Sequence, residues 1–290
     1  MSHRHSRTRF RGVLSLWTRT PMFRIERGPL LIQTLAVCLA AQAFDETEFV
    51  TDRGGAHVAD SLGWKFHRIV MPLDEFQAEG LDHIWALGKL VACSIQDEPF
   101  VHFDGDVLLF KPLPERLSRA RLIAQSPDPV HYYAGADMRR ALAIAGLPAG
   151  HTAFNAGLLG GGDVALVRAY AFAALELALK FRHCDLNGTT TSMMIEQYHL
   201  AVFSARTGVP VTTLLPERPT RGQLTRAGYA HLTGSAKRSR IYVAKAEARL
   251  AKSFPEAYER FLAGWSVLAR DATPTDSGHD CSAAPMTAAL

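Results

Sequence analysis

Residues 100–114 read FVHFDGDVLLFKPLP, so that a short apolar run leads directly into an acidic pair. A run of this length, rich in Phe and Val and bounded by Pro99 and Asp104, is typical of a buried strand. The carboxylates of Asp104 and Asp106 would repel each other at its end unless a cation lay between them. Hard divalent cations such as Mg²⁺ and Mn²⁺ bind carboxylate oxygens and often complete their shell with phosphates, and Gly105 lets the backbone come close to them. The stretch therefore predicts a metal and diphosphate site; the alternative is a surface turn in which Asp-Gly only supplies turn geometry.

Outward from this stretch, strand-like and helix-like segments alternate along the first two thirds of the chain. Strands are expected before Asp104 and at residues 12–17, 47–51, 67–71, 107–110 and 121–125, and helices at residues 29–44, 55–62 and 81–96. This alternation predicts an α/β fold with a mostly parallel central sheet flanked by helices. Ligands of such sheets bind at the carboxyl ends of the strands, where Asp52 and Asp104 would both lie.

The last third of the chain contains a Gly-rich segment and several helix-like stretches. We expect Gly160-Gly161-Gly162 to form a turn, because no P-loop spacing follows them. Helices are expected at residues 163–181 and 189–205, a strand at 209–215 and a closing helical region at 246–269. The resulting prediction is a basic N-terminal tail (1–11), one domain (12–270) and a C-terminal tail (271–290) that lacks an apolar pattern and is expected to be disordered.

Composition narrows the class of protein. The chain has 290 residues, of which 48% are hydrophobic, so it can bury a large core. Its formal net charge of +4 gives no indication of nucleic-acid binding. Part of the excess lies in the opening residues, which could instead contact anionic lipid headgroups. The four cysteines are scattered, and we find neither a signal peptide nor an apolar stretch of about 18 residues, so we expect a soluble cytoplasmic protein.

Six further motifs accompany the acidic pair in a fixed order. They are Trp17-Thr18, Thr51-Asp52, Gly88-Lys89-Leu90, Phe154-Asn155-Ala156-Gly157-Leu158, and Glu196-Gln197 followed by the loop from His231 to Lys237. Over roughly residues 12–240, this set resembles glycosyltransferases of the GT-A fold. Within that fold it is most similar to the retaining group that includes glycogenin and the bacterial lipopolysaccharide galactosyltransferases.

The resemblance implies a metal-dependent transfer of a sugar from a nucleotide diphosphate sugar, a UDP-sugar, to a carbohydrate or glycolipid acceptor, with retention of configuration. Asp104, Asp106 and His231 would hold Mn²⁺ or Mg²⁺, and the imidazole favours Mn²⁺. Glu196 or Gln197 would lie near the anomeric carbon. The residues that would bind the donor are Trp17, Asp52, Lys89, Gly105, Asn155, Gly157 and Lys237.

Other interpretations of these residues remain open at this point. Asp-Gly-Asp after an apolar strand also resembles the first motif of haloacid-dehalogenase-type phosphatases, in which the first Asp is a nucleophile. A non-catalytic module that binds nucleotide sugars would keep the same fold. Lys89, Glu196 and Gln197 could be solvated helix residues, His231 a structural histidine and Asn155 a turn residue. The chain also departs from the retaining group, with Arg238-Ser239 in place of Pro-Trp and Glu196 in place of Asp.

Overall fold

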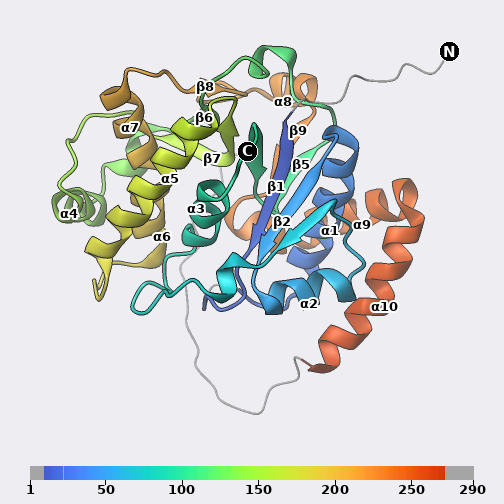
Figure 1. Cartoon of the computed structure of the whole chain (residues 1–290). Coiled ribbons are helices and arrows are strands. Elements are labelled where there is room, and N and C mark those ends of the chain that lie inside the picture. Colours follow the sequence, from blue (N-terminus) through green and yellow to red (C-terminus); the bar gives the residue numbers. More distant parts are fainter. Residues whose placement is uncertain (1–9, 22, 272–290) are drawn as a thin grey trace.

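A mixed seven-stranded sheet forms the centre of the molecule (Figure 1). In spatial order its strands are β3 (Arg68–Val70), β2 (Thr47–Thr51), β1 (Arg11–Leu16), β4 (Phe100–Phe103), β7 (Phe154–Gly161), β6 (Ile123–Pro127) and β8 (Thr212–Thr213). Four neighbouring pairs are parallel, and the two pairs that involve β7 are antiparallel. The expected α/β fold with a mostly parallel sheet is confirmed.

The computed structural model describes residues 10–21 and 23–271. Our expectations for residues 1–9 and 272–290, including a basic tail that contacts lipid, lie outside the described residues. Arg11 is the first residue of β1, so this strand begins one residue earlier than expected. Its guanidinium lies 2.8 Å from Asp97 and 3.0 Å from Glu98, which explains why a basic residue is ordered there. No helix within the described ranges is long and apolar enough to cross a membrane.

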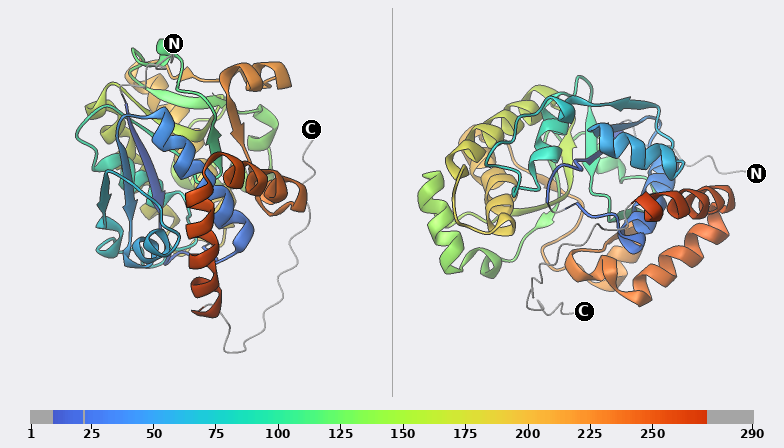
Figure 2. Two further views of the ribbon diagram at one scale, coloured as in Figure 1. Left: turned by 90° about the vertical axis from the view of Figure 1, so that its right-hand side faces the viewer. Right: turned by 90° about the horizontal axis from the view of Figure 1, so that it is seen from below.

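Helices cover both faces of the sheet (Figures 1 and 2). They are α1 (Arg27–Ala43), α2 (Arg53–Ser61), α3 (Leu87–Ser94), α4 (Ala136–Ala145), α5 (Val164–Ala178), α6 (Gly188–Ser192), α7 (His199–Thr207), α8 (Arg221–Ala227), α9 (Arg240–Ser253) and α10 (Pro255–Asp271). Helices α3, α4, α5 and α7 contribute to the core on one face, whereas α1, α2, α9 and α10 contribute to the core on the other.

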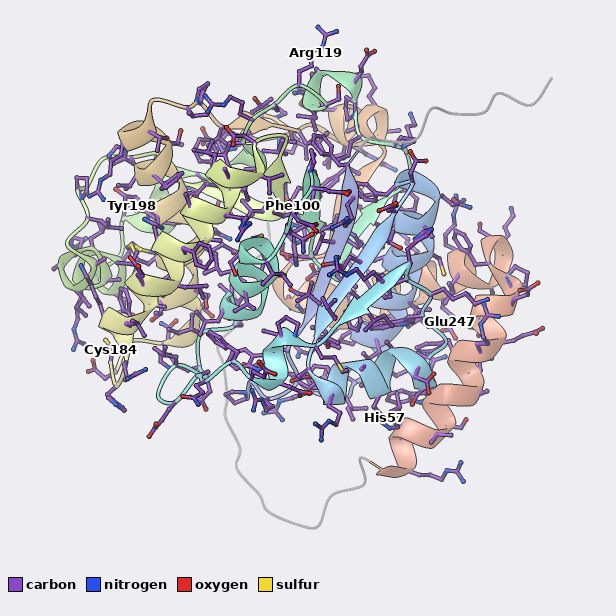
Figure 3. All side chains as sticks on the ribbon, viewed as in Figure 1. His57, Phe100, Arg119, Cys184, Tyr198 and Glu247 are labelled. Atoms are coloured by element: carbon purple, nitrogen blue, oxygen red, sulfur yellow. The ribbon has the colours of Figure 1, made fainter. Side chains whose placement is uncertain are left out.

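Strand β4 shows how the sequence builds these two layers. Successive side chains of a strand point to opposite faces. Phe100 belongs to the core beneath α3 and α5, while Val101 and Phe103 belong to the core beneath α1. Phe100 accordingly lies near the middle of the molecule (Figure 3). The strand is buried on both faces, as its continuous apolar run predicts.

The structure differs from two expectations, one about the partner of a strand and one about a turn. The segment expected at 107–110 is a strand, β5 (Val107–Leu109), but it leaves the main sheet and pairs with β9 (Tyr229–His231) in an antiparallel ribbon. Gly160 and Gly161 do not form a turn, because they are the last residues of β7. A Cβ atom on Gly160 would meet the backbone of Phe100 on β4, so close contact between two central strands requires glycine there.

Helices are found where the sequence predicted them, but their lengths differ from the expected ones. Only Leu87–Ser94 is helical in the segment expected at 81–96, since the chain before it forms turns. The closing region is two helices, and Pro255 begins the second, where its missing N–H costs nothing. The helix expected at 189–205 contains a π-helical turn, Met193–Tyr198, between α6 and α7.

Candidate active site around the acidic pair

The ribbon of β5 and β9 brings His231 to the acidic pair. His231 lies directly opposite Val107 in this ribbon, and Val107 is the residue that follows Asp106. The backbone N–H of Leu232 donates to the carbonyl of Asp106 at 3.0 Å, and the N–H of Asp104 donates to the carbonyl of Gly157 at 3.0 Å. The backbone positions of the acidic turn and of His231 are therefore set by hydrogen bonds to neighbouring strands.

The side chains of Asp104, Asp106 and His231 converge. One ligand atom from each lies within 4.8 Å of the other two. His231 Nε2 is 3.1 Å from Asp106 Oδ1 and 3.9 Å from Asp104 Oδ2. All three side chains are half-buried, so the cluster is reachable from solvent. Two carboxylates and one imidazole are a ligand set that fits Mn²⁺ or Mg²⁺.

Lys237 adds a positive charge beside this cluster. Its Nζ lies 3.2 Å from Asp106 Oδ2, and 35% of its side chain is exposed. Burial alone would raise the pKa of the Asp106 carboxyl, but the hydrogen bond from His231 and the charges of His231 and Lys237 outweigh burial and lower it. Asp106 is thus held as a carboxylate at neutral pH.

A buried ammonium group links the acidic pair to the helix that carries Glu196. Lys89 Nζ, on α3, lies 2.7 Å from Asp104 Oδ1 and 2.7 Å from Glu196 Oε1, and it donates to the carbonyl of Ala156 at 2.7 Å. The Lys89 side chain is 5% exposed and that of Glu196 is fully buried. Burial would lower the pKa of Lys89, but the two carboxylates raise it above its ordinary value.

Glu196 and Gln197 both lie on the π-helical turn, a feature that is frequent at functional sites. Burial raises the pKa of Glu196 to about 7. The charge of Asp104 also raises this pKa, whereas the charge of Lys89 lowers it. Gln197 Oε1 accepts a hydrogen bond from the Tyr133 hydroxyl at 2.7 Å, and this hydroxyl is 2.8 Å from Asp128 Oδ2. Burial raises the pKa of Asp128. The π-helical turn therefore places Glu196 against Lys89 and Gln197 against the hydroxyl of Tyr133.

A sequence model of a family of unknown function, DUF6734, matches residues 30–263, which include every residue of this cluster. The chain belongs to this family. No curated protein matches the DUF6734 chain.

Two solved glycosyltransferase structures are similar to this DUF6734 protein. One is the galactosyltransferase LgtC in complex with donor and acceptor sugar analogues, with 14% identity and a TM-score of 0.46 over 86% of this chain and 95% of that one. The other is mouse xyloside xylosyltransferase 1 in its apo form, with 13% identity and a TM-score of 0.41 over 71% of this chain and 85% of that one.

Asp52, expected to bind a donor, caps α2 in the DUF6734 structure. Its carboxylate accepts hydrogen bonds from the N–H and the hydroxyl of Thr18, the N–H of Arg19 and the N–H of Gly55. The side chain is buried. Each oxygen already accepts two hydrogen bonds, so in this conformation Asp52 fixes the loop that follows β1.

Three other residues expected to bind the donor make contacts of different kinds. Trp17 is 5% exposed and contacts Phe76 edge-on at a ring distance of 5.8 Å. Asn155 lies in β7 rather than in a turn, and its Oδ1 accepts a hydrogen bond from the N–H of Gly157 at 3.0 Å. Gly105 faces Gln33 of α1, and a Cβ atom on Gly105 would lie 2.8 Å from the Gln33 amide carbon.

Sequence reasoning missed several polar residues that the fold brings to the cluster. Gln125 Oε1 is 2.7 Å from His231 Nδ1. His102 lies on β4, 4.0 Å from Asp104, and its Nε2 is 2.9 Å from Ser15 Oγ. Burial, together with the charge of Lys89, lowers the pKa of His102 well below its ordinary value, so it is neutral. A histidine two residues before Asp104 on a buried strand was a signal that could have been used.

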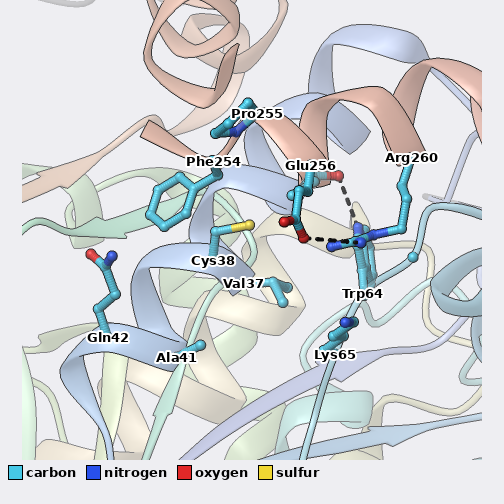
Figure 4. A pocket seen from close by; sticks show the side chains of 13 residues that line it. Val37, Cys38, Ala41, Gln42, Trp64, Lys65, Phe254, Pro255, Glu256 and Arg260 are labelled. Atoms are coloured by element: carbon cyan, nitrogen blue, oxygen red, sulfur yellow. Dashed lines mark hydrogen bonds and ion pairs between the residues drawn. The ribbon is translucent and has the colours of Figure 1, made fainter. Parts of the chain in front are cut away.

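A pocket of about 340 Å³ lies elsewhere, between α1 and the start of α10 (Figure 4). Its lining is mainly apolar and includes Val37, Cys38, Trp64 and Phe254. Burial raises the pKa of the Cys38 thiol to about 11, so the thiol is unreactive at neutral pH. None of the site residues discussed above lines this pocket.

Gly157→Ala should damage the site through direct overlap. A Cβ atom there would lie 2.6 Å from His231 Nδ1 and closer still to Gln125 Oε1. We expect the free energy of unfolding to fall by about 1–3 kcal/mol, measured by urea denaturation. Gly135→Ala is the control, because no heavy atom lies within 4 Å of its Cβ position. Equal stability of the two variants would contradict this account.

The pKa of Glu196 predicts how stability depends on pH in protein kept free of metal with EDTA. The folded carboxyl has a pKa of about 7, above its ordinary value of 4.5, so the native state binds the extra proton between these pH values. The free energy of unfolding should therefore fall as pH rises through this window, by on the order of 3 kcal/mol. Glu196→Gln should flatten this part of the urea-denaturation profile, and an unchanged slope would contradict the assignment.

Proposed function

We propose that this chain is a metal-dependent glycosyltransferase that transfers a sugar from a nucleotide diphosphate sugar to an acceptor. The observation that carries the proposal is the convergence of Asp104, Asp106 and His231, with Lys237 beside them. This arrangement suits an anionic ligand that brings its own diphosphate oxygens. The motif order supports a UDP-sugar as donor and a carbohydrate or glycolipid as acceptor.

The two carboxylates and the imidazole would hold Mn²⁺ or Mg²⁺. When bound, such an ion stabilises, as a Lewis acid, the negative charge that develops on a departing diphosphate. Lys237 has an exposed ammonium group next to Asp106 and would add a mobile positive charge for the phosphates. Asp106, kept ionised by His231 and Lys237, provides the charge that this site needs.

Glu196 and Gln197 are proposed to act near the anomeric carbon of the donor sugar. Gln197 is 9% exposed and Glu196 is not exposed, so Gln197 is better placed to touch a sugar. Glu196 would act through Lys89, which joins its carboxylate to Asp104. Lys89 is therefore proposed as a positioning residue.

Trp17, Asp52, Gly105, Asn155 and Gly157 are proposed to shape the site for the donor. Asp52 would do so by fixing the loop that follows β1. Gly157 leaves room for His231, and Gly105 keeps the acidic turn free of a side chain. Asn155 holds the backbone of β7 at Gly157 through its side-chain hydrogen bond.

Retention of configuration is part of the proposal. In a retaining transfer the departing diphosphate oxygen can take the proton of the acceptor hydroxyl on the same face of the sugar. An inverting enzyme instead needs a carboxylate or histidine that deprotonates the acceptor. The His231-to-Lys237 loop resembles that of the retaining group and supports this choice.

The test uses the full-length protein with Mn²⁺ and a panel of UDP-, GDP- and ADP-sugars. We expect one UDP-sugar to raise the Tm and to release UDP only when Mn²⁺ is present. The anomeric configuration of the product, determined by NMR with a donor of known configuration, should match that of the donor. An inverted product would refute retention alone.

Two other outcomes would replace the proposal. Rapid phosphate release from phosphomonoesters, without stabilisation by any nucleotide, would identify a phosphatase. Stabilisation by a nucleotide sugar, without turnover on water or on any acceptor, would identify a binding module.

A further inference from the structure

Gln125 lies opposite an irregularity in β7, next to the candidate metal cluster. Ala124 pairs with Leu159 and Ser126 with Asn155, so one β6 residue, Gln125, faces three β7 residues (156–158) and the bulge is in β7. Bulges re-aim a side chain and are common beside active sites. The carbonyl of Gln125 still accepts from the N–H of Leu215 at 2.8 Å, so its backbone remains fixed in the sheet.

The side-chain oxygen of Gln125 meets two residues of β9. Oε1 is 2.7 Å from His231 Nδ1 and accepts from the Tyr229 hydroxyl at 2.6 Å. Tyr229 and His231 are two positions apart on one strand and so share a face. An amide oxygen has two lone pairs and can accept both hydrogen bonds.

The opposite strand leaves space for this contact. Gly157 of β7 lies against Gln125 Oε1 and the His231 ring, where any Cβ atom would overlap with both. The glycine in the β7 bulge and the Gln125 amide therefore both lie against the imidazole. Regular pairing of β6 with β7 would require neither the bulge, nor the glycine, nor the glutamine.

The geometry orients the histidine. With Nδ1–H donating to Gln125, the lone pair of Nε2 is the one available to an ion, and Nε2 faces Asp106 at 3.1 Å and Asp104 at 3.9 Å. We propose that Gln125 is a positioning residue that holds His231 in the ring orientation and tautomer required of a metal ligand. This inference rests on the proposed metal site, and such partners of ligand histidines commonly affect metal affinity.

The experiment measures binding of Mn²⁺ alone, from the EPR signal of the free ion during a titration. Gln125→Met keeps the length of the side chain but removes the acceptor, and its Kd should rise about 10- to 100-fold. Gln125→Glu keeps an acceptor at the same place and should bind Mn²⁺ at least as tightly as the unaltered protein. Tyr229→Phe is the matched control, because it removes only the other hydrogen bond to Oε1 and should bind normally.

The same substitutions in a His231→Ala background separate positioning from a general effect of charge or packing. If Gln125 acts through His231, neither Gln125→Met nor Gln125→Glu should change the Mn²⁺ affinity further in that background. Should Gln125→Met fail to fold, as judged by its Tm, Gln125→Leu takes its place in both backgrounds with the same expected results, because leucine also lacks an acceptor.

The inference is overturned if Gln125→Met binds Mn²⁺ like the unaltered protein, or if the effects persist without His231. Unaltered protein that releases UDP and binds Mn²⁺ would then keep the proposed function while refuting the role of Gln125. Unaltered protein that binds no Mn²⁺ would refute both the metal site and this inference.

Discussion

Asp106→Asn should lower sugar transfer by about a hundred- to a thousand-fold while the protein remains folded. The amide keeps the shape of the side chain but removes the negative charge that faces His231 and Lys237. A neutral amide is a much poorer partner for a divalent ion than a carboxylate. Activity is measured, with Mn²⁺ present, as UDP released from the UDP-sugar that the proposed donor panel selects, and folding is followed by the Tm.

Asp185→Asn is the control for this prediction. Asp185 is also in an ion pair, with Arg140, but 72% of its side chain is exposed. Its activity should be unchanged, since exposed ion pairs contribute little. EDTA should abolish the activity of the unaltered protein, and Mn²⁺ should restore it. Normal turnover by Asp106→Asn, or activity that resists EDTA, would show that the proposed metal site is wrong.

Lys89→Met should lower the free energy of unfolding by about 3–5 kcal/mol at pH 7. The ammonium group is buried and is 2.7 Å from each of two carboxylates. Its removal leaves Glu196 without a counterion in the core and the carbonyl of Ala156 without its donor. The pKa of Lys89 is raised, so its stabilising charge is fully present below its ordinary value of 10.5 and therefore at pH 7. Urea denaturation measures the effect.

A second substitution tests the cause of this loss. Lys89→Met combined with Glu196→Gln should recover part of the stability, because a neutral amide is cheaper to bury than an unpaired carboxylate. Lys65→Met is the control, since Lys65 is exposed and its substitution should change the free energy by less than about 0.5 kcal/mol. A double variant that is less stable than Lys89→Met would contradict the buried ion cluster.

Local patterns predicted much of the fold. The run at 47–51 coincides with β2, and the run before Asp104 is β4. Apolar periodicity repeats over a few residues and therefore identifies elements without knowledge of their neighbours. The same patterns did not reveal that Gly160 lies inside a central strand, because a strand that needs glycine for close contact lacks the apolar signal.

Roles inside the site were harder to predict than its location. Asp52 lies at the end of a strand as expected, yet its carboxylate is occupied by hydrogen bonds that cap α2. Lys89 could equally have been a solvated helix residue, and it is instead buried between two carboxylates. The sequence of a helix shows which of its faces is apolar. It does not show which charged residues the fold packs against that helix.

The sequence by itself determined the alternating α/β order and the position of Asp104 and Asp106 directly after a buried strand. His231 entered only through a motif resemblance, and no pattern indicated Gln125. Tertiary structure decided that His231 lies beside Asp106, through pairing of β5 with β9, and that Gln125 meets its ring, opposite the bulge in β7. The physical reason is that periodicity is a local property of the chain, whereas strand pairing and register depend on residues distant in sequence.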